Sequence, residues 1–285
     1  MTPLNHISQP QVWILAGIQL IGLSMFIIVW LQWRKRRIAG FSFGESIRTC
    51  PLGWGELGQL TALLLLVYSL FLWIGLVLGK LGALRNDSQQ VLFLVVCQTL
   101  LYLFLLAFVQ RVLWHKGETW SRVFGLQSTS FKNVLVTSAV ALGAILLPLQ
   151  LIAWGVHSLF EALQWPMEPQ AIIQLLSRIR SRWLQGALVA LAVVGAPALE
   201  EIFFRGLLYP QLKLRFGFVH ALWINSALFA VFHLHVPSAI PLFALGIAFT
   251  LLYEWRGNLS ASILFHTGFN SLSLILLFTL KDSLS

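Results

Sequence analysis

Long stretches without a charged side chain are the feature that most limits what this chain can fold into. Four stretches lie at residues 12–31, 60–79, 91–109 and 134–160, and none of them contains Asp, Glu, Lys or Arg. A helix needs about 20 apolar residues to cross the hydrocarbon core of a bilayer, so each stretch is long enough to span. Only 10% of all residues are charged, against roughly 25% in soluble domains. The sequence therefore predicts an integral membrane protein.

The second half of the chain predicts four further crossings. Residues 216–253 also lack charged side chains, but they exceed the length of one crossing, and Pro237 and Pro241 predict a turn between two helices. Residues 184–209 and 259–280 supply the other two crossings. We therefore expect an all-α fold, a polytopic membrane helix bundle of about eight transmembrane helices.

The expected bundle divides into two parts of one integral membrane domain. Residues 1–183 should hold four N-terminal transmembrane helices and a connecting segment. This segment contains Arg178, Arg180 and Arg182 among apolar residues, which predicts a short amphipathic helix at the membrane surface. Residues 184–285 should hold the other four helices.

Basic residues predict how the bundle is oriented. With the N-terminus outside, twelve Lys and Arg residues fall in cytoplasmic loops and six fall on the outer side, with Arg205 inside a span. The largest group is the run at residues 34–37, directly after the first span. Because cytoplasmic loops are enriched in Lys and Arg, both ends of the chain are expected outside. This distribution explains the net charge of +9 without a nucleic-acid partner.

Polar side chains inside the spans are the candidates for function, and they lie in the last four helices. A charged side chain at mid-span costs about 2.5 to 3.5 kcal/mol on insertion scales, so such residues must face partners or a wet cavity. The candidates are Glu200, Glu201, Arg205, Asn225, His233, His235, His266 and Asn270.

Helical geometry predicts different roles for the two neighbouring glutamates. Glu201 and Arg205 are four residues apart, with the acid first, which is the favourable order for an ion pair. Glu200 points about 100° away from Glu201 and has no cation on its own side of the helix, so it is free to exchange protons with water. Gly195 and Pro197 precede the pair and predict a bend at this depth.

Histidines contribute to the same expected site. His233 and His235 point about 200° apart on a helix, so only one of them can serve a given site. His266 and Asn270 share a helix face. A glutamate, a histidine and a His/Asn pair can together perform hydrolysis: the glutamate activates water, and the pair donates hydrogen bonds to the oxyanion.

Three motifs in this half resemble those of the CAAX protease and bacteriocin-processing family, intramembrane proteases that include the type II CAAX prenyl endopeptidases. The motifs are EExxxR at Glu200, Glu201 and Arg205, FxxxH at Phe229 and His233, and HxxxN at His266 and Asn270. The resemblance covers residues 184–280, and the four N-terminal helices are not specific to any family.

The resemblance implies hydrolysis of a peptide or protein substrate in or at the lipid bilayer, at a site that opens to the cytoplasmic side. Glu200 and His233 would activate water, His266 and Asn270 would form the oxyanion hole, and Glu201 with Arg205 would support them. The compact chain suggests a bacterial plasma membrane. The substrate remains open between a prenylated protein, a bacteriocin precursor and another peptide.

Two questions remain open at this point. The first concerns metal: Glu200, His233 and His266 could supply three zinc ligands, although we favour a reaction without a cofactor. The second concerns function: Glu200 and the histidines could relay protons in a transporter, or the chain could be a catalytically silent scaffold. The absence of a duplicated half weighs against a transporter.

Overall fold

The computed structural model describes residues 9–38, 47 and 52–281, and all regular secondary structure in these residues is helical. The elements in chain order are α1 (Gln9–Ile38), α2 (Trp54–Lys80), α3 (Asp87–His115), α4 (Trp120–Val123), α5 (Phe131–Ala162), α6 (Ala171–Arg178), α7 (Arg182–Ala190), η2 (Leu191–Gly195), α8 (Ala196–Glu201), η3 (Ile202–Leu208), α9 (Tyr209–Phe232), η4 (Val236–Ser238), α10 (Ala239–Arg256) and α11 (Leu259–Lys281). The predicted all-α bundle is confirmed.

Within the described residues, six helices are long and apolar enough to cross a membrane, and a shorter apolar helix runs over Gln19–Gln32 inside α1. One of the six is a run of 51 helical residues, Arg182–Phe232, which comprises α7, η2, α8, η3 and α9. It contains two of the eight predicted crossings. Its break lies at Gly217, where φ is 78°. Glycine adopts this conformation without steric cost. The predicted eight crossings therefore correspond to six long helices, one shorter helix and this break.

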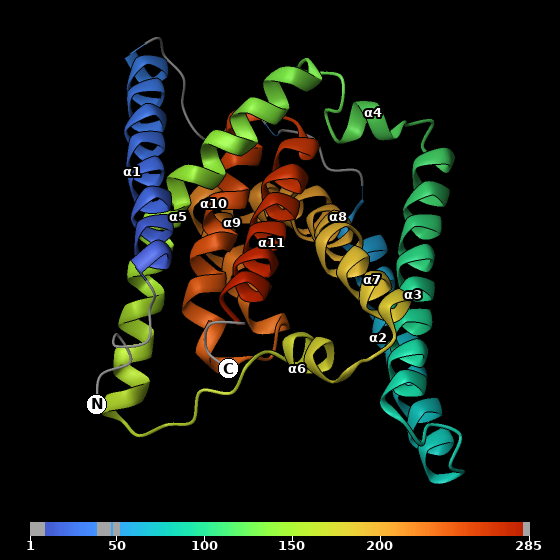
Figure 1. The fold of residues 1–285 in the computed structure, drawn as a ribbon. Helices are drawn as coiled ribbons and strands as arrows, with labels where there is room; N and C mark the ends of the chain where they lie inside the picture. The colour runs from blue at the N-terminus through green and yellow to red at the C-terminus, as the bar shows by residue number, and fades with distance from the viewer. Residues whose placement is uncertain (1–8, 39–46, 48–51, 282–285) are drawn as a thin grey trace.

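The helices form two packed groups joined by the α7–α9 segment (Figure 1). On one side α1 lies along α5, and Gly22 and Gly143 allow close approach: a Cβ added at Gly22 would lie 3.0 Å from the carbonyl oxygen of Gly143. The α5 helix also packs against α10 and α11. On the other side α2 pairs with α3, and α3 contacts α7. The last four spans thus lie between the two N-terminal helix pairs.

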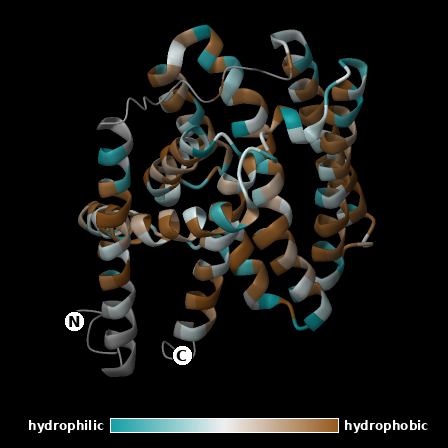
Figure 2. Ribbon diagram, turned by 90° about the horizontal axis from the view of Figure 1, so that it is seen from above, coloured by the Kyte–Doolittle hydropathy of each residue, from teal (hydrophilic) through white to brown (hydrophobic). Residues whose placement is uncertain are grey.

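The outer surface of the bundle is apolar, as a lipid-facing surface requires. On α2, the side chains of Leu66, Trp73 and Leu76 are 65%, 63% and 67% exposed. Figure 2 shows hydrophobic residues along the helices and hydrophilic ones mainly near their ends. Such a large exposed apolar surface is stable in hydrocarbon and not in water. The chain is an integral membrane protein.

The predicted amphipathic segment forms the short helix α6 and the turn after it. Leu176 and Ile179 are buried against α3 and α7, whereas Arg178, Arg180 and Arg182 are exposed. In Figure 1 α6 lies at the same end of the bundle as the C-terminus, and α4 lies at the opposite end. The three arginines thus lie at the α6 end of the bundle, and their contact with a membrane surface stays a prediction.

Candidate active site

Irregular backbone positions the two glutamates. The short helix α8 ends at Glu201 and lies between two π-helical turns, η2 and η3. Pro197 near the start of α8 lacks an N–H group, so a regular helix could not continue through it without loss of a hydrogen bond. The bend expected near Gly195 and Pro197 takes the form of these π-turns, which frequently occur at functional sites.

Glu201 is the centre of a buried polar network, and its side chain is 0% exposed. Its Oε1 accepts from Nη1 of Arg205 at 3.0 Å and from Nδ1 of His266 at 2.9 Å. Its Oε2 accepts from the hydroxyl of Ser262 at 2.6 Å. The predicted ion pair of Glu201 and Arg205 is therefore present, and the same carboxylate also holds His266 in place.

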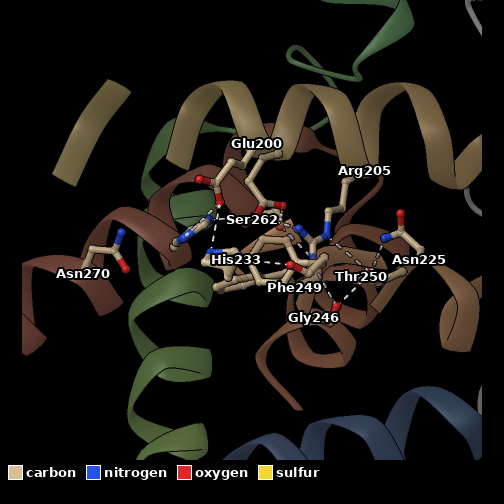
Figure 3. A network of polar contacts seen from close by, with 12 residues as sticks. Glu200, Arg205, Asn225, His233, Gly246, Phe249, Thr250, Ser262 and Asn270 are labelled. Atoms are coloured by element: carbon tan, nitrogen blue, oxygen red, sulfur yellow. Dashed lines mark hydrogen bonds and ion pairs between the residues drawn. The ribbon is translucent and has the colours of Figure 1, made fainter. Parts of the chain in front are cut away.

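Arg205 joins three helices through its other N–H groups and through the face of its guanidinium group. Its Nη2 donates to the carbonyl oxygen of Gly246 at 3.1 Å, and its Nε donates to the hydroxyl of Thr250 at 3.4 Å. The guanidinium carbon lies 4.4 Å from the ring centroid of Phe229, a distance at which a cation–π interaction is favourable. Arg205 thus connects η3, α9 and α10 behind the glutamates, as Figure 3 shows.

Glu200 lies on the other side of α8 and faces two histidines. Its Oε2 is 3.9 Å from Nε2 of His233 and 4.0 Å from Nε2 of His266. These distances exceed a hydrogen bond, and Oε2 has no hydrogen-bond partner among the residues that the structure describes. The Glu200 side chain is 29% exposed, against 0% for Glu201. The Glu200 side chain is thus partly exposed, whereas its Oε2 is buried, has no hydrogen-bond partner among the described residues and faces both imidazoles.

In each imidazole, the hydrogen bond made by Nδ1 determines whether Nε2, which faces Glu200, carries a proton or a lone pair. Nδ1 of His233 lies 2.7 Å from the carbonyl oxygen of Phe229, which can only accept, so Nδ1 carries the proton. Nδ1 of His266 donates to the Glu201 carboxylate. In their neutral forms both rings therefore present the lone pair of Nε2 toward Glu200. Three acceptors thus point toward one another, and a water that enters between them can donate to two of the three.

Aromatic side chains form the apolar wall of this site. The ring of Phe229 lies 4.8 Å from that of His233 and 5.8 Å from that of His266, centroid to centroid. Phe249 stacks on His266 at 4.5 Å. Because these rings leave each imidazole little freedom to rotate, they help fix the direction of Nε2.

Of the three remaining predicted residues, Asn225 joins the network by donating to the hydroxyl of Thr250 at 3.3 Å, whereas His235 and Asn270 lie apart from it. His235 contacts the hydroxyl of Ser238 at 2.8 Å and the carbonyl oxygen of Glu168 at 2.9 Å, so it belongs to a surface turn. Asn270 donates from Nδ2 to the carbonyl oxygen of Ala192 at 2.8 Å. In Figure 3 it lies at the opposite side of the view from Arg205, Thr250 and Asn225. One of its two amide protons remains for another acceptor.

Sequence analysis missed Ser262 and Thr250, which complete the network. Ser262 precedes His266, a predicted site residue, by four residues and so shares its helix face, whereas no predicted site residue stands in this relation to Thr250. Small hydroxyl residues are common in membrane helices, where they bond to carbonyl groups of their own helix. For Ser262, a position on the same helix face as a site residue was the available signal. Residue type alone could not have distinguished these two side chains from the other Ser and Thr residues of the spans.

The geometry can be compared with that of a zinc site. Glu200, His233 and His266 offer one carboxylate and two imidazoles, a familiar donor set. The separations of 3.9 and 4.0 Å exceed the roughly 3.3 Å between two ligands of a tetrahedral zinc ion. In the described part of the chain, no three or more His, Cys, Asp or Glu side chains form a group that could hold a metal ion. The side chains as placed do not fit zinc.

A cavity of about 360 Å³ lies beside the site, between α3, α6, α7, η2, α8 and α11. Its wall is mostly aliphatic. It is lined by Leu94, Val95, Gln98, Tyr102, Ile172, Leu175, Leu188, Leu191, Ala192, Ala196 and Asn270. Pockets of this size and composition accommodate apolar groups and orient them through a few polar side chains.

Comparison with known proteins identifies the part of the chain that carries the site. Residues 182–272 match the family described as "Type II CAAX prenyl endopeptidase Rce1-like". No significant match was found among curated proteins or among solved structures. The matched segment contains the glutamate pair, both histidines and Asn270. Residues 182–272, about a third of the chain, are therefore similar to the type II CAAX prenyl endopeptidase family of membrane proteases.

Proposed function

We propose that this protein hydrolyses a peptide bond of a membrane-associated peptide or protein, with Glu200 as general base for a water molecule. The observation that supports this proposal is the position of Oε2 of Glu200, 3.9 and 4.0 Å from two histidine nitrogens and free of hydrogen bonds to the described residues. A water that enters between these groups during the reaction would supply the hydrogen-bond donor that the buried Oε2 lacks.

The reaction follows from the acceptors around that water. Glu200 takes a proton from the water, and the oxygen attacks the carbonyl carbon while Nε2 of His233 orients it. The carbonyl π electrons move to the oxygen, which becomes an oxyanion. When the C–N bond breaks, the oxyanion electrons restore the carbonyl, and Glu200 returns its proton to the leaving nitrogen. The products are a carboxylic acid and an amine, so atoms and charge balance.

His266 and Asn270 remain the proposed donors to the oxyanion. His266 can donate from Nε2 when it carries protons on both nitrogens, because Nδ1 already donates to Glu201. Asn270 can donate with the amide proton that Ala192 does not use. The second role requires the substrate to reach past the histidines toward α11, where the cavity extends.

Glu201 and Arg205 are proposed to act as supports. Both are 0% exposed, so neither can contact a substrate without a rearrangement of the bundle. Glu201 orients His266 and compensates the charge of Arg205, and Arg205 holds three helices together. Their loss should therefore reduce the amount of folded protein as well as activity.

The decisive experiment compares wild-type protein with Glu200→Gln. Membranes that contain either protein are incubated, and newly formed peptide N-termini are quantified by mass spectrometry. A cleaved sequence is then made as a fluorogenic membrane-anchored peptide for kinetics with purified protein in liposomes. Glu200→Gln should lower kcat by at least about 100-fold, because general base catalysis contributes this much or more.

A matched control is Glu161→Gln, which alters an exposed glutamate at the end of α5. This variant should cleave as the wild type does. Equal cleavage by wild type and Glu200→Gln, or no N-terminus produced by wild type above the level of Glu200→Gln, would refute the proposal. A Glu200-dependent proton flux across liposomes without cleavage would instead support a transporter.

The side from which a substrate arrives depends on membrane topology. The cavity beside Glu200 extends to α6. The distribution of basic residues predicts that α6 lies on the outer side, whereas the family resemblance implies an opening to the cytoplasm. These two expectations differ in the side assigned to α6, so labelling of a cysteine placed on this segment separates them.

A further inference from the structure

Tyr102 brings a polar group from the N-terminal half of the chain to the edge of the catalytic site. It lies on α3, outside the segment that matches the protease family. Its side chain hydrogen-bonds with Gln98, one turn earlier on the same helix, and it lines the same cavity as Ala196 of α8 and Asn270 of α11. Sequence analysis had assigned no function to this helix.

The position of the Tyr102 ring is defined by the backbone that carries the glutamates. A Cβ added at Gly195 would lie 3.3 Å from Cε2 of the tyrosine, so the ring packs closely on the last residue of η2. This glycine directly precedes α8, on which Glu200 lies. A substituent at position 195 would displace the ring, whereas glycine lets it approach the π-turn.

The cavity beside the site is where the hydroxyl group of Tyr102 could bind a substrate. Of the described residues that line it, only Gln98, Tyr102 and Asn270 are polar. A peptide bound there in extended form brings carbonyl groups into an apolar environment, where each needs a hydrogen-bond donor. A phenol is a donor at neutral pH. Tyr102 lines this cavity together with Ala196, which precedes Glu200, the proposed base, by one turn of the helix.

We propose that Tyr102 is a catalytic residue that donates a hydrogen bond to the carbonyl oxygen of the scissile peptide bond. The bond strengthens as that oxygen becomes an oxyanion, and Tyr102 keeps its proton throughout. The hydrogen bond with Gln98 orients the hydroxyl group, and the absence of a side chain at Gly195 allows the ring to pack against η2. This assignment rests on the proposed function of Glu200 and adds a donor from α3 to those expected on α11.

The test is Tyr102→Phe, which removes the hydroxyl and keeps the ring that packs on Gly195. With the fluorogenic peptide in liposomes, kcat should fall about 100-fold, as for loss of one oxyanion-hole donor. The KM should stay near the wild-type value, because the contact is made chiefly in the transition state. The melting temperature in detergent should not change, since ring packing is retained.

Tyr68→Phe is the matched control, because Tyr68 lies on α2 and is 48% exposed. It should leave kcat, KM and melting temperature unchanged. The inference is overturned if Tyr102→Phe keeps the wild-type kcat, or if it raises KM alone. A lower melting temperature with an unchanged kcat would likewise overturn it and indicate a structural role.

Glu200→Gln in the same assay separates the two proposals. If this variant is inactive and Tyr102→Phe is fully active, the role of Tyr102 fails and the proposed function stands. If Glu200→Gln is as active as wild type, the proposed function fails, and the assignment of Tyr102 fails with it.

Discussion

Removal of the Glu201 carboxylate should destabilise the protein far more than removal of its neighbour. Glu201→Gln leaves the guanidinium group of Arg205 charged and 0% exposed, without its counter-ion. Loss of one partner of a buried ion pair costs about 3–5 kcal/mol. The glutamine also presents an N–H₂ group where the carboxylate accepts from Arg205, His266 and Ser262. At about 2–4 °C per kcal/mol, the melting temperature should fall by roughly 6–20 °C.

The comparison variant is Glu200→Gln, whose Oε2 accepts no hydrogen bond from the described residues. Its effect on stability should stay below about 1 kcal/mol. Both proteins are heated in the same detergent at the same rate, and the fraction that remains monodisperse is followed by size-exclusion chromatography. A melting temperature of Glu201→Gln as high as that of Glu200→Gln would refute the reasoning.

A double variant identifies the cause of the loss. Glu201→Gln combined with Arg205→Met removes the buried charge together with its counter-ion and keeps an apolar side chain among Phe229 and Phe249. Because the two residues are in contact, their effects should not add, and the interaction energy should be about 1–3 kcal/mol. The double variant should therefore be more stable than Glu201→Gln alone. Simple additivity would contradict the role given to the unpaired charge.

Three further predictions follow from the site and its surroundings. His233→Ala should lower kcat by roughly 100-fold, whereas His235→Ala, which alters only a surface turn, should retain activity; the reverse order would show that the wrong histidine has been assigned. Treatment with a zinc chelator should leave cleavage by purified protein unchanged, and loss of cleavage that added zinc restores would contradict the geometric argument. In a variant without Cys50 and Cys97, a cysteine placed at Arg180 should react with an impermeant maleimide only from outside; reaction only from the cytoplasmic side would invert the topology and agree with the opening implied by the family resemblance.

Helical periodicity accounts for the side-chain arrangement that was predicted within single helices. Glu201 and Arg205 lie on one face of one helix, so their pairing depends on local geometry. The same reasoning separated His233 from His235 and left Glu200 without a cation. In hydrocarbon each polar group needs a partner, so the candidates could be recognised by their presence in apolar spans.

Distances between helices depend on packing and were not predictable in this way. The positions of His233 and His266 around Glu200 depend on how α9 and α11 cross α8, and the role of Ser262 depends on the same crossing. The approach of Tyr102 depends on a close contact between α3 and Gly195. None of these pairs is close in the chain, so no periodicity connects them.

Charge-free length and polar residues at mid-span were therefore enough to predict a helical membrane protein and most of its candidate residues, because a bilayer imposes these requirements on any single helix. The packed bundle established which of those residues meet. It placed Asn270 beside Ala192 of η2 and brought α3 to the edge of the site. Such contacts arise where the side chains of two helices pack together. The sequence of one helix determines only one of the two surfaces that meet.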